Sequence, residues 1–127
     1  MTARQRLRQK RFRYSVFLGL VAALWLLIAP PRWWLNLTKP VDLSDPAASG
    51  RCLVVQYDCR SCHRIDGRGA ALAPDLAGVT GRLNEASLQK RLRNPRSGRK
   101  ETPMPNFRLS DGEIEAIISY LREVDAQ

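Results

Sequence analysis

The chain has 127 residues, of which 44% are hydrophobic and 26% charged, and its formal net charge is +9. This length accommodates one domain beside any targeting or anchoring segment. Residues 1–13 hold six Lys or Arg residues and no acid, whereas residues 32–127 hold fifteen basic and twelve acidic residues. A nucleic-acid-binding domain would show a basic face interleaved with aromatic side chains, but all three Trp residues lie at or before position 34. We therefore predict no nucleic-acid partner.

An uncharged stretch of eighteen residues, YSVFLGLVAALWLLIAPP, occupies positions 14–31. About 20 predominantly apolar residues cross a bilayer core as a helix, and here the apolar residues cover every face of that helix. Trp33 and Trp34 follow, where an interfacial aromatic belt would lie. The sequence therefore predicts a transmembrane anchor at 14–34, with residues 1–13 in the cytoplasm by the positive-inside rule.

Export of the remaining residues has two explanations, an uncleaved anchor or a cleaved signal peptide, because both combine a basic segment with an apolar core. The end of the apolar stretch, LLIAPPRWW, contains two prolines and no small-x-small cleavage site. This favours the uncleaved anchor. We expect a protein of the bacterial inner membrane whose domain lies on the periplasmic side.

The exported part begins with a predicted linker at 35–45, which has no sustained periodicity. The domain is expected to cover 46–127. Its first helix begins with Asp45 as the N-cap and Pro46 at the first helical position, and is predicted to run to Cys59. Four glycines and a proline then indicate a long loop.

Two further helices are predicted after this loop. The second covers 84–94, where a proline stops it. The last helix follows a capping box formed by Ser110 and Glu113, and apolar residues recur behind it with helical spacing. No run of residues has a convincing strand pattern. The sequence therefore predicts an all-α domain of about three helices joined by glycine- and proline-rich loops.

This domain is small for the core that it must build. A domain of about eighty residues buries little apolar surface and usually needs an additional stabilising element, such as a cross-link or a bound group. Ahead of the last helix its only Phe or Tyr residues are Tyr57 and Phe107. We expect a further hydrophobic group to fill the interior.

The stretch DCRSCHRIDG, residues 58–67, offers three kinds of chemistry. A thioredoxin-like dithiol would place its cysteines at a helix start within a strand–helix pattern, which is missing here. A zinc site needs four ligands, which structural sites usually supply as two closely spaced pairs. Beyond the motif only Cys52 is available, so the second pair is missing. The third possibility is covalent attachment of haem through Cys59 and Cys62, with His63 as the proximal iron ligand.

The haem interpretation explains more of the chain than its rivals. One haem c would supply the missing hydrophobic core. His63 is the single histidine, so a second histidine ligand within the chain is excluded. Met104 is the only methionine besides the initiator and lies between two prolines in TPMPNF. A lone methionine is often a core gap-filler, but one outside any helix is poorly placed for that role. Elimination therefore makes Met104 the predicted sixth ligand, and His/Met ligation raises the reduction potential.

At this point residues 46–123 resemble a class I c-type cytochrome. The resemblance is carried by CRSCH, APDLAGVTGRL, NPRSGRKETPMPNF and LSDGEIEAIISYL. It implies that Pro74 lies beside the proximal imidazole, with a nearby backbone carbonyl accepting the ring proton. It also implies that the first and last helices cross closely at Gly50 and Tyr120. The family's usual Phe or Tyr four residues before the first haem cysteine is Val55 in this chain.

The resemblance implies one-electron transfer between respiratory or photosynthetic chain components, with no catalytic residue. The chain would be either a tethered shuttle or a small haem subunit of a larger oxidoreductase complex. An enzyme-class alternative is a sensor-like or peroxidase-like haem protein in which Met104 does not bind iron. Residues 90–100 hold six basic residues and no acid, which predicts docking to an acidic redox partner; a solvated helix face is the competing explanation. Cys52 is expected to be buried, facing the haem side of the first helix.

Overall fold

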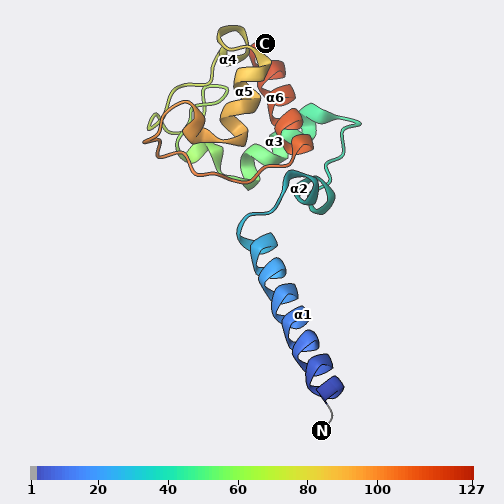
Figure 1. Cartoon of the computed structure of the whole chain (residues 1–127). Helices are drawn as coiled ribbons and strands as arrows, with labels where there is room; N and C mark the ends of the chain where they lie inside the picture. Colours follow the sequence, from blue (N-terminus) through green and yellow to red (C-terminus); the bar gives the residue numbers. More distant parts are fainter. Residues whose placement is uncertain (1–2) are drawn as a thin grey trace. The chain divides into compact units, whose positions relative to one another are not determined.

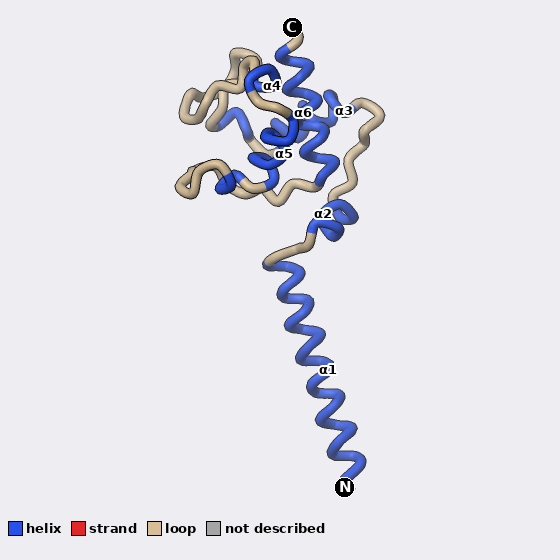
Figure 2. The backbone as a smooth tube through the Cα atoms, turned by 45° about the horizontal axis from the view of Figure 1, so that its top comes forward, coloured by secondary structure: helices blue, strands red, loops and turns tan. Residues whose placement is uncertain are grey.

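The computed structural model describes residues 3–127, so the first two residues of the predicted basic segment lie outside the described part (Figure 1). The chain divides into two compact units, one ending at Trp34 and the other spanning Leu35–Gln127. Over residues 3–127 all regular elements are helices, and the one β-type pairing is an isolated bridge between Ile65 and Arg68 (Figure 2). The predicted all-α class is confirmed.

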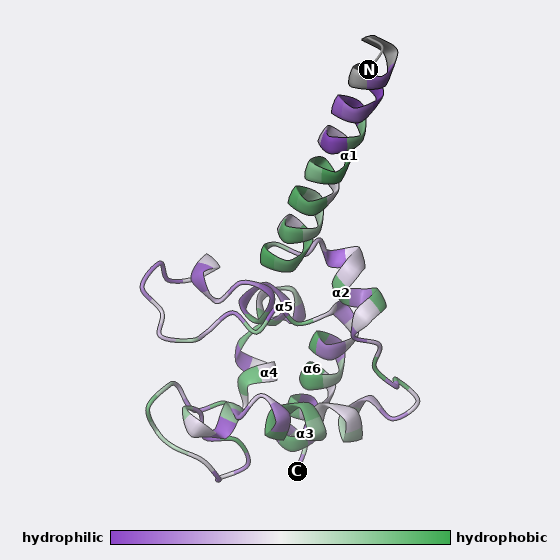
Figure 3. Ribbon diagram, turned by 90° about the horizontal axis from the view of Figure 1, so that it is seen from below, coloured by the Kyte–Doolittle hydropathy of each residue, from purple (hydrophilic) through white to green (hydrophobic). Residues whose placement is uncertain are grey.

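The first unit is dominated by α1 (Ala3–Ile28). Among the described residues it is the one helix that is long and apolar enough to cross a membrane, over Arg8–Ile28. Its hydropathy changes from polar near the N-terminus to apolar along the rest of its length (Figure 3). The helix ends at Ile28 because Pro30 and Pro31 follow, and proline disfavours helical geometry in the residue before it.

A short helix, α2 (Arg32–Thr38), leads into the second unit, where α3 (Pro46–Gln56) begins. The Asp45 carboxylate accepts a hydrogen bond from the Ala48 N–H at 3.0 Å, which is the predicted N-cap. The helix ends three residues earlier than predicted, since Asp58 adopts left-handed backbone angles with φ 51°. That turn breaks the helical path just ahead of the cysteine motif.

The centre of the second unit is the crossing of α3 with α6 (Asp111–Asp125), which meet at an angle in Figure 1. Gly50 permits this approach: a Cβ atom there would lie 2.0 Å from the Ala116 carbonyl oxygen and 2.8 Å from Tyr120 Cβ. The predicted pairing of Gly50 with Tyr120 is therefore confirmed. The fully or nearly buried side chains around the crossing include Leu53, Val54, Ile114, Ile117, Ile118 and Leu121.

Shorter elements complete the domain. They are the 3₁₀ turn η1 (Cys59–Ser61), α4 (Val79–Arg82), α5 (Glu85–Arg93) and the 3₁₀ turn η2 (Pro95–Ser97). The capping box that the sequence predicts is present, because Glu113 N–H donates to Ser110 Oγ and Ser110 N–H donates to the Glu113 carboxylate. Long loops therefore join a compact helical core, and those loops carry the cysteine motif and Met104.

Candidate haem-binding site

The cysteine motif forms a single tight turn at the end of α3. The N–H groups of Cys62 and His63 both donate to the Cys59 carbonyl oxygen, at 3.4 and 3.0 Å. The two thiols and the imidazole are therefore projected from a few consecutive residues of fixed backbone. This is the arrangement that two thioether bonds and an adjacent axial ligand would need.

The two thiols of the motif have different surroundings. Cys59 is half-buried against the hydrophobic core, and burial raises the pKa of its thiol. Cys62 is exposed, and both are free thiols in this structure. Each is therefore available as an S–H group that can add across a vinyl double bond.

The imidazole of His63 is oriented by a backbone carbonyl. Its Nδ1 lies 2.8 Å from the Pro74 oxygen. A carbonyl oxygen can only accept a hydrogen bond, so Nδ1 donates its ring proton here, and the free lone pair of a neutral imidazole in this position is on Nε2. Such bonds fix the ring orientation of metal-bound histidines. The structure thus brings His63 and Pro74 together with the two cysteines.

The loop after the motif folds back onto it through backbone hydrogen bonds. Ala70 N–H donates to the Arg60 oxygen at 2.9 Å, while Leu72 and Ala73 N–H donate to the Cys62 oxygen at 3.1 and 2.9 Å. Gly69 makes the close return possible, since it has φ +114° and a Cβ there would lie 2.3 Å from the His63 oxygen. The position of Pro74 beside the histidine follows from this folded-back loop.

Arg60, inside the motif, makes a contact that sequence reasoning did not identify. Its guanidinium Nη2 donates to the Tyr120 hydroxyl at 2.8 Å. Tyr120 is buried in α6, so the bond ties the motif turn to the helix crossing. The resemblance named Tyr120 only for helix packing, and no local pattern connects residues sixty positions apart.

Met104 lies on a different loop, between η2 and α6. Its side chain is half-buried, and its N–H donates to Thr102 Oγ1 at 3.3 Å. Three residues further on, Phe107 packs against Tyr57, with ring centroids 5.3 Å apart. This contact joins the methionine-bearing loop to the segment just before the motif. The assignment of Cys59, Cys62, His63 and Met104, with Pro74, as haem-binding residues stays a prediction.

The prediction that Cys52 is buried is wrong, and its position also bears on the zinc alternative. It is exposed, not buried, because Gly50, Leu53 and Val54 face α6 and turn Cys52 toward an open groove beside Val41. Val55 is also exposed, at 67%, and Val54 takes the buried position instead. Within residues 3–127, no group of three or more His, Cys, Asp or Glu side chains is arranged to hold a metal ion. Cys52 therefore does not complete a zinc ligand set with the motif.

The donors of the motif fit a covalently attached haem. The set consists of two thiols, one on either side of a single turn, and an imidazole with an oriented free nitrogen. Leu72 lies next to Cys62 along the folded-back loop and is 80% exposed, so an apolar side chain is available beside the motif. These residues suit a large flat hydrophobic ring better than a small ion.

Comparison with known proteins identifies the same region. The family model "Cytochrome c" matches residues 47–125. A nitric oxide reductase subunit from Halomonas halodenitrificans is 27% identical over 104 residues, covering 72% of this chain and 69% of that protein. Cytochrome c oxidase subunit 2 of Alkalihalophilus pseudofirmus is 30% identical over 87 residues, covering 61% of this chain. The chain spans only 25% of the length of that oxidase protein.

Proposed function

Because the chain belongs to the cytochrome c family, we propose that it transfers single electrons through one covalently bound haem c. The family match and the one N-terminal apolar helix bear out the prediction of a membrane-anchored class I c-type cytochrome. The all-helical domain bears out the predicted cytochrome c fold. The electron-carrier role and the individual haem-binding residues are the proposal.

In this proposal each residue of the site has one task. Cys59 and Cys62 would hold the cofactor through thioether bonds. His63 would supply Nε2 as an iron ligand, while the Pro74 carbonyl keeps the proton on Nδ1 and fixes the ring. Met104 would supply a sulfur ligand to the same iron. When bound, the haem iron supplies a one-electron redox couple, whose potential a methionine ligand raises.

The observation that carries the proposal is the 2.8 Å hydrogen bond between His63 Nδ1 and the Pro74 oxygen. It leaves one nitrogen of the only histidine prepared as a ligand, within one turn of two free thiols. The test is haem staining of the full chain on a denaturing gel. Wild type and a Cys52→Ser control should keep the stain, whereas Cys59→Ser with Cys62→Ser should lose it. Loss of stain from the wild type would contradict covalent attachment.

We also propose that the N-terminus lies in the cytoplasm and the haem domain on the periplasmic side of the inner membrane. The six basic residues at 1–13 support this orientation through the positive-inside rule. Protease added to sealed spheroplasts should digest the haem domain and spare the N-terminal segment. Protection of the haem domain would contradict the orientation.

The redox partner in this proposal has an acidic docking surface. All six basic side chains of residues 90–100 are exposed, although Arg93 is engaged with Asp111 at 2.9 Å. Exposed basic residues steer association with acidic surfaces, and salt screens that steering. Electron-transfer rates with the partner should therefore fall as salt is added. Rates independent of salt would remove this part of the proposal.

A second candidate is a haem-bearing subunit of a larger oxidoreductase complex. It is favoured because both relatives are named as subunits of such enzymes. Solubilisation in mild detergent followed by native size analysis separates the two. Haem staining at the size of the single chain supports a free carrier, whereas co-migration with a larger redox enzyme supports the second candidate.

A further inference from the structure

The segment between the apolar helix and the haem domain is bonded to the domain at two points, which we call the clamp and define as Asn36 and Lys39. Asn36 forms a reciprocal pair with Asp111: its Nδ2 donates to the Asp111 carboxylate at 2.8 Å, and its Oδ1 accepts from the Asp111 N–H at 2.9 Å. Asp111 is the first residue of α6. The pair therefore joins α2 to the start of the last helix.

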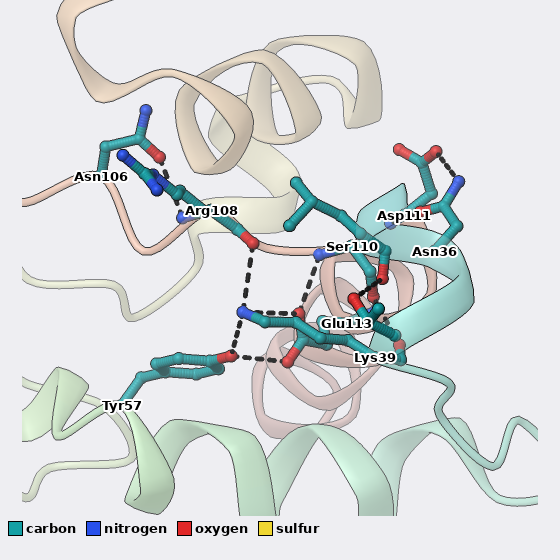
Figure 4. Close-up of polar contacts among 10 residues, drawn as sticks. Asn36, Lys39, Tyr57, Asn106, Arg108, Ser110, Asp111 and Glu113 are labelled. Carbon is teal, nitrogen blue, oxygen red and sulfur yellow. Dashed lines mark hydrogen bonds and ion pairs between the residues drawn. The ribbon is translucent and has the colours of Figure 1, made fainter. Parts of the chain in front are cut away.

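Lys39 is the second point of the clamp and makes four contacts within the domain (Figure 4). Its Nζ donates to the Tyr57 hydroxyl at 3.1 Å and to the Arg108 carbonyl oxygen at 3.2 Å. It also lies 3.8 Å from the Glu113 carboxylate. Its own carbonyl oxygen accepts from Ser110 Oγ at 3.0 Å. Lys39 thus contacts two segments of the domain: the one that follows Met104 and the one that precedes the cysteine motif.

The burial of Glu113 explains why the contacts of Lys39 with the domain are difficult to break. Its side chain is only 5% exposed, and the Tyr57 hydroxyl donates to it at 2.6 Å. A buried carboxylate is costly unless it is paired and hydrogen-bonded, and loss of one partner is destabilising. Lys39 forms an ion pair with this carboxylate. Detaching the segment would therefore remove that ion pair from a buried carboxylate.

The clamp changes how much chain is free between the apolar helix and the haem domain. The helix α1 ends at Ile28 and α3 begins at Pro46. A free tether over the intervening residues could extend by about 60 Å, at about 3.4 Å per residue. With the clamp closed, only residues 29–35 remain before Asn36, which span at most about 25 Å. The helical start of α2 at Arg32 shortens this span further.

We propose that this clamp keeps the haem domain on a short tether, so that the haem exchanges electrons with partners whose redox centre lies near the membrane surface. The inference rests on the proposed function, because it concerns where the same haem meets its partner. A carrier that swings between distant membrane partners would need the longer free tether. The clamp removes ten of the seventeen residues between α1 and α3 that could provide it.

The test compares the same flexible Gly–Ser spacer at two places in the full-length holoprotein in lipid vesicles. A spacer of about ten residues has a root-mean-square span of about 17 Å. It is inserted either after Ala29, before the clamp, or after Leu43, in the exposed loop that the clamp bypasses. The readout is relaxation of a nitroxide attached at Glu115→Cys, in a Cys52→Ser background, by nickel-chelating lipids at the membrane surface.

The spacer after Ala29 should reduce the nickel-induced relaxation severalfold, because it lengthens the tether. The spacer after Leu43 should leave the relaxation unchanged, because the clamp bridges that loop. Equal effects of the two spacers in the otherwise unaltered chain would overturn the proposal.

Two variants that open the clamp provide the internal comparison. In Lys39→Met and in Asn36→Ala, each of which removes one point of the clamp, the spacer after Leu43 should reduce the relaxation, which it does not do in the unaltered chain. Leu37→Ala, at a residue 70% exposed in the same segment, should behave as wild type. Asn36→Ala changes no charge, so it remains informative if Lys39→Met fails to fold. If neither clamp variant changes the spacer response, the proposal is wrong.

The relaxation measurement and the proposed function can fail separately. The nitroxide reports distance to the membrane whether or not the haem accepts electrons. The visible spectrum of the same samples reports the covalent haem. A normal haem spectrum with equal spacer effects would reject the clamp alone, and a missing haem spectrum would reject the proposed function.

Discussion

The two loops that carry the candidate haem ligands are built differently. The motif loop, residues 58–76, is folded back on itself by backbone hydrogen bonds and by the bond from His63 to Pro74. The methionine loop, residues 98–110, is held by short-range side-chain contacts, such as Met104 N–H to Thr102 Oγ1 and Arg108 N–H to Asn106 Oδ1. One ligand position is therefore set by the backbone and the other by a few side chains.

This difference has a functional consequence. A histidine fixed by its own backbone loop should keep its orientation through both oxidation states, which limits structural change on electron transfer. The methionine loop also has contacts from other parts of the domain, among them the packing of Phe107 on Tyr57 and the bond from Lys39 to the Arg108 oxygen. We therefore expect substitutions in the motif loop to affect assembly, and those in the methionine loop to affect redox properties.

The largest expected effect is that of Gly69→Ala. A Cβ there would approach the His63 oxygen at 2.3 Å and the Arg60 oxygen at 2.9 Å, in a backbone conformation with φ +114°. We expect a loss of at least about 2 kcal/mol in the free energy of unfolding, with a lower yield of haem-attached protein. Urea unfolding and haem staining are the measurements. The control is Gly67→Ala, which shares a positive φ but has no atom within 4 Å of its Cβ, so it should lose much less.

The next effect concerns the methionine loop. Met104→Leu keeps the side-chain volume but removes the sulfur, so haem attachment and unfolding free energy should change little. The reduction potential should fall by on the order of 0.1 V, within the roughly 0.8 V range that axial ligands set. Potentiometric titration checks this. An unchanged potential would favour the alternative of an open sixth position.

A third effect concerns the start of α4, just after the motif loop, where Asp125 accepts hydrogen bonds from Gly78 N–H, Thr80 N–H and Thr80 Oγ1. Burial opposes ionisation of Asp125, but the bonds from Thr80 and Gly78 outweigh it, and the pKa is lowered. The stabilisation is therefore present above the unfolded-state pKa of about 4 and is lost as pH falls through the folded-state pKa.

Asp125→Asn should accordingly lower the unfolding free energy at neutral pH, and the difference from wild type should shrink below about pH 4. Urea unfolding at a series of pH values measures this. Glu115→Gln, an exposed carboxylate on the same helix, is the matched control and should show little difference at any pH. A loss of stability in Asp125→Asn that does not depend on pH would show that the lowered pKa is not its source.

The smallest effect is expected for Thr102→Val, which removes the oxygen that accepts the Met104 N–H. One neutral hydrogen bond contributes about 0.5–1.5 kcal/mol, and this one is near the surface. The result should be faster binding of added imidazole to ferric haem, with the potential nearly unchanged. An imidazole-binding rate equal to that of wild type would show that the bond does not hold the methionine loop.

Local sequence signals predicted much of this structure. The capping box at Ser110 and Glu113 sets the start of α6, and Asp45 with Pro46 sets the start of α3, because caps depend on neighbouring residues alone. The family resemblance supplied the Gly50–Tyr120 crossing and the proximity of Pro74 to His63. Each of these rests on a short motif or on a family pattern.

The remaining features depend on contacts between distant residues. Lys39 meets Glu113 and Arg60 meets Tyr120 only after α3 and α6 have packed, so no local pattern reveals either pair. The exposure of Cys52 was missed for a related reason. Helical spacing separates the faces of a helix, but the choice of the face that meets α6 rests on Gly50, and Cys52 does not share that face.

The most direct test of the central claim is spectroscopic identification of both axial ligands in the full chain. The near-infrared spectrum of the oxidised protein should show the sulfur-to-iron charge-transfer absorption of a methionine ligand, and Met104→Leu should abolish it. Imidazole should bind the wild type slowly and the variant rapidly. A wild-type protein that lacks this absorption and binds imidazole as fast as Met104→Leu would contradict ligation of the iron by Met104, and with it the proposed His/Met pair.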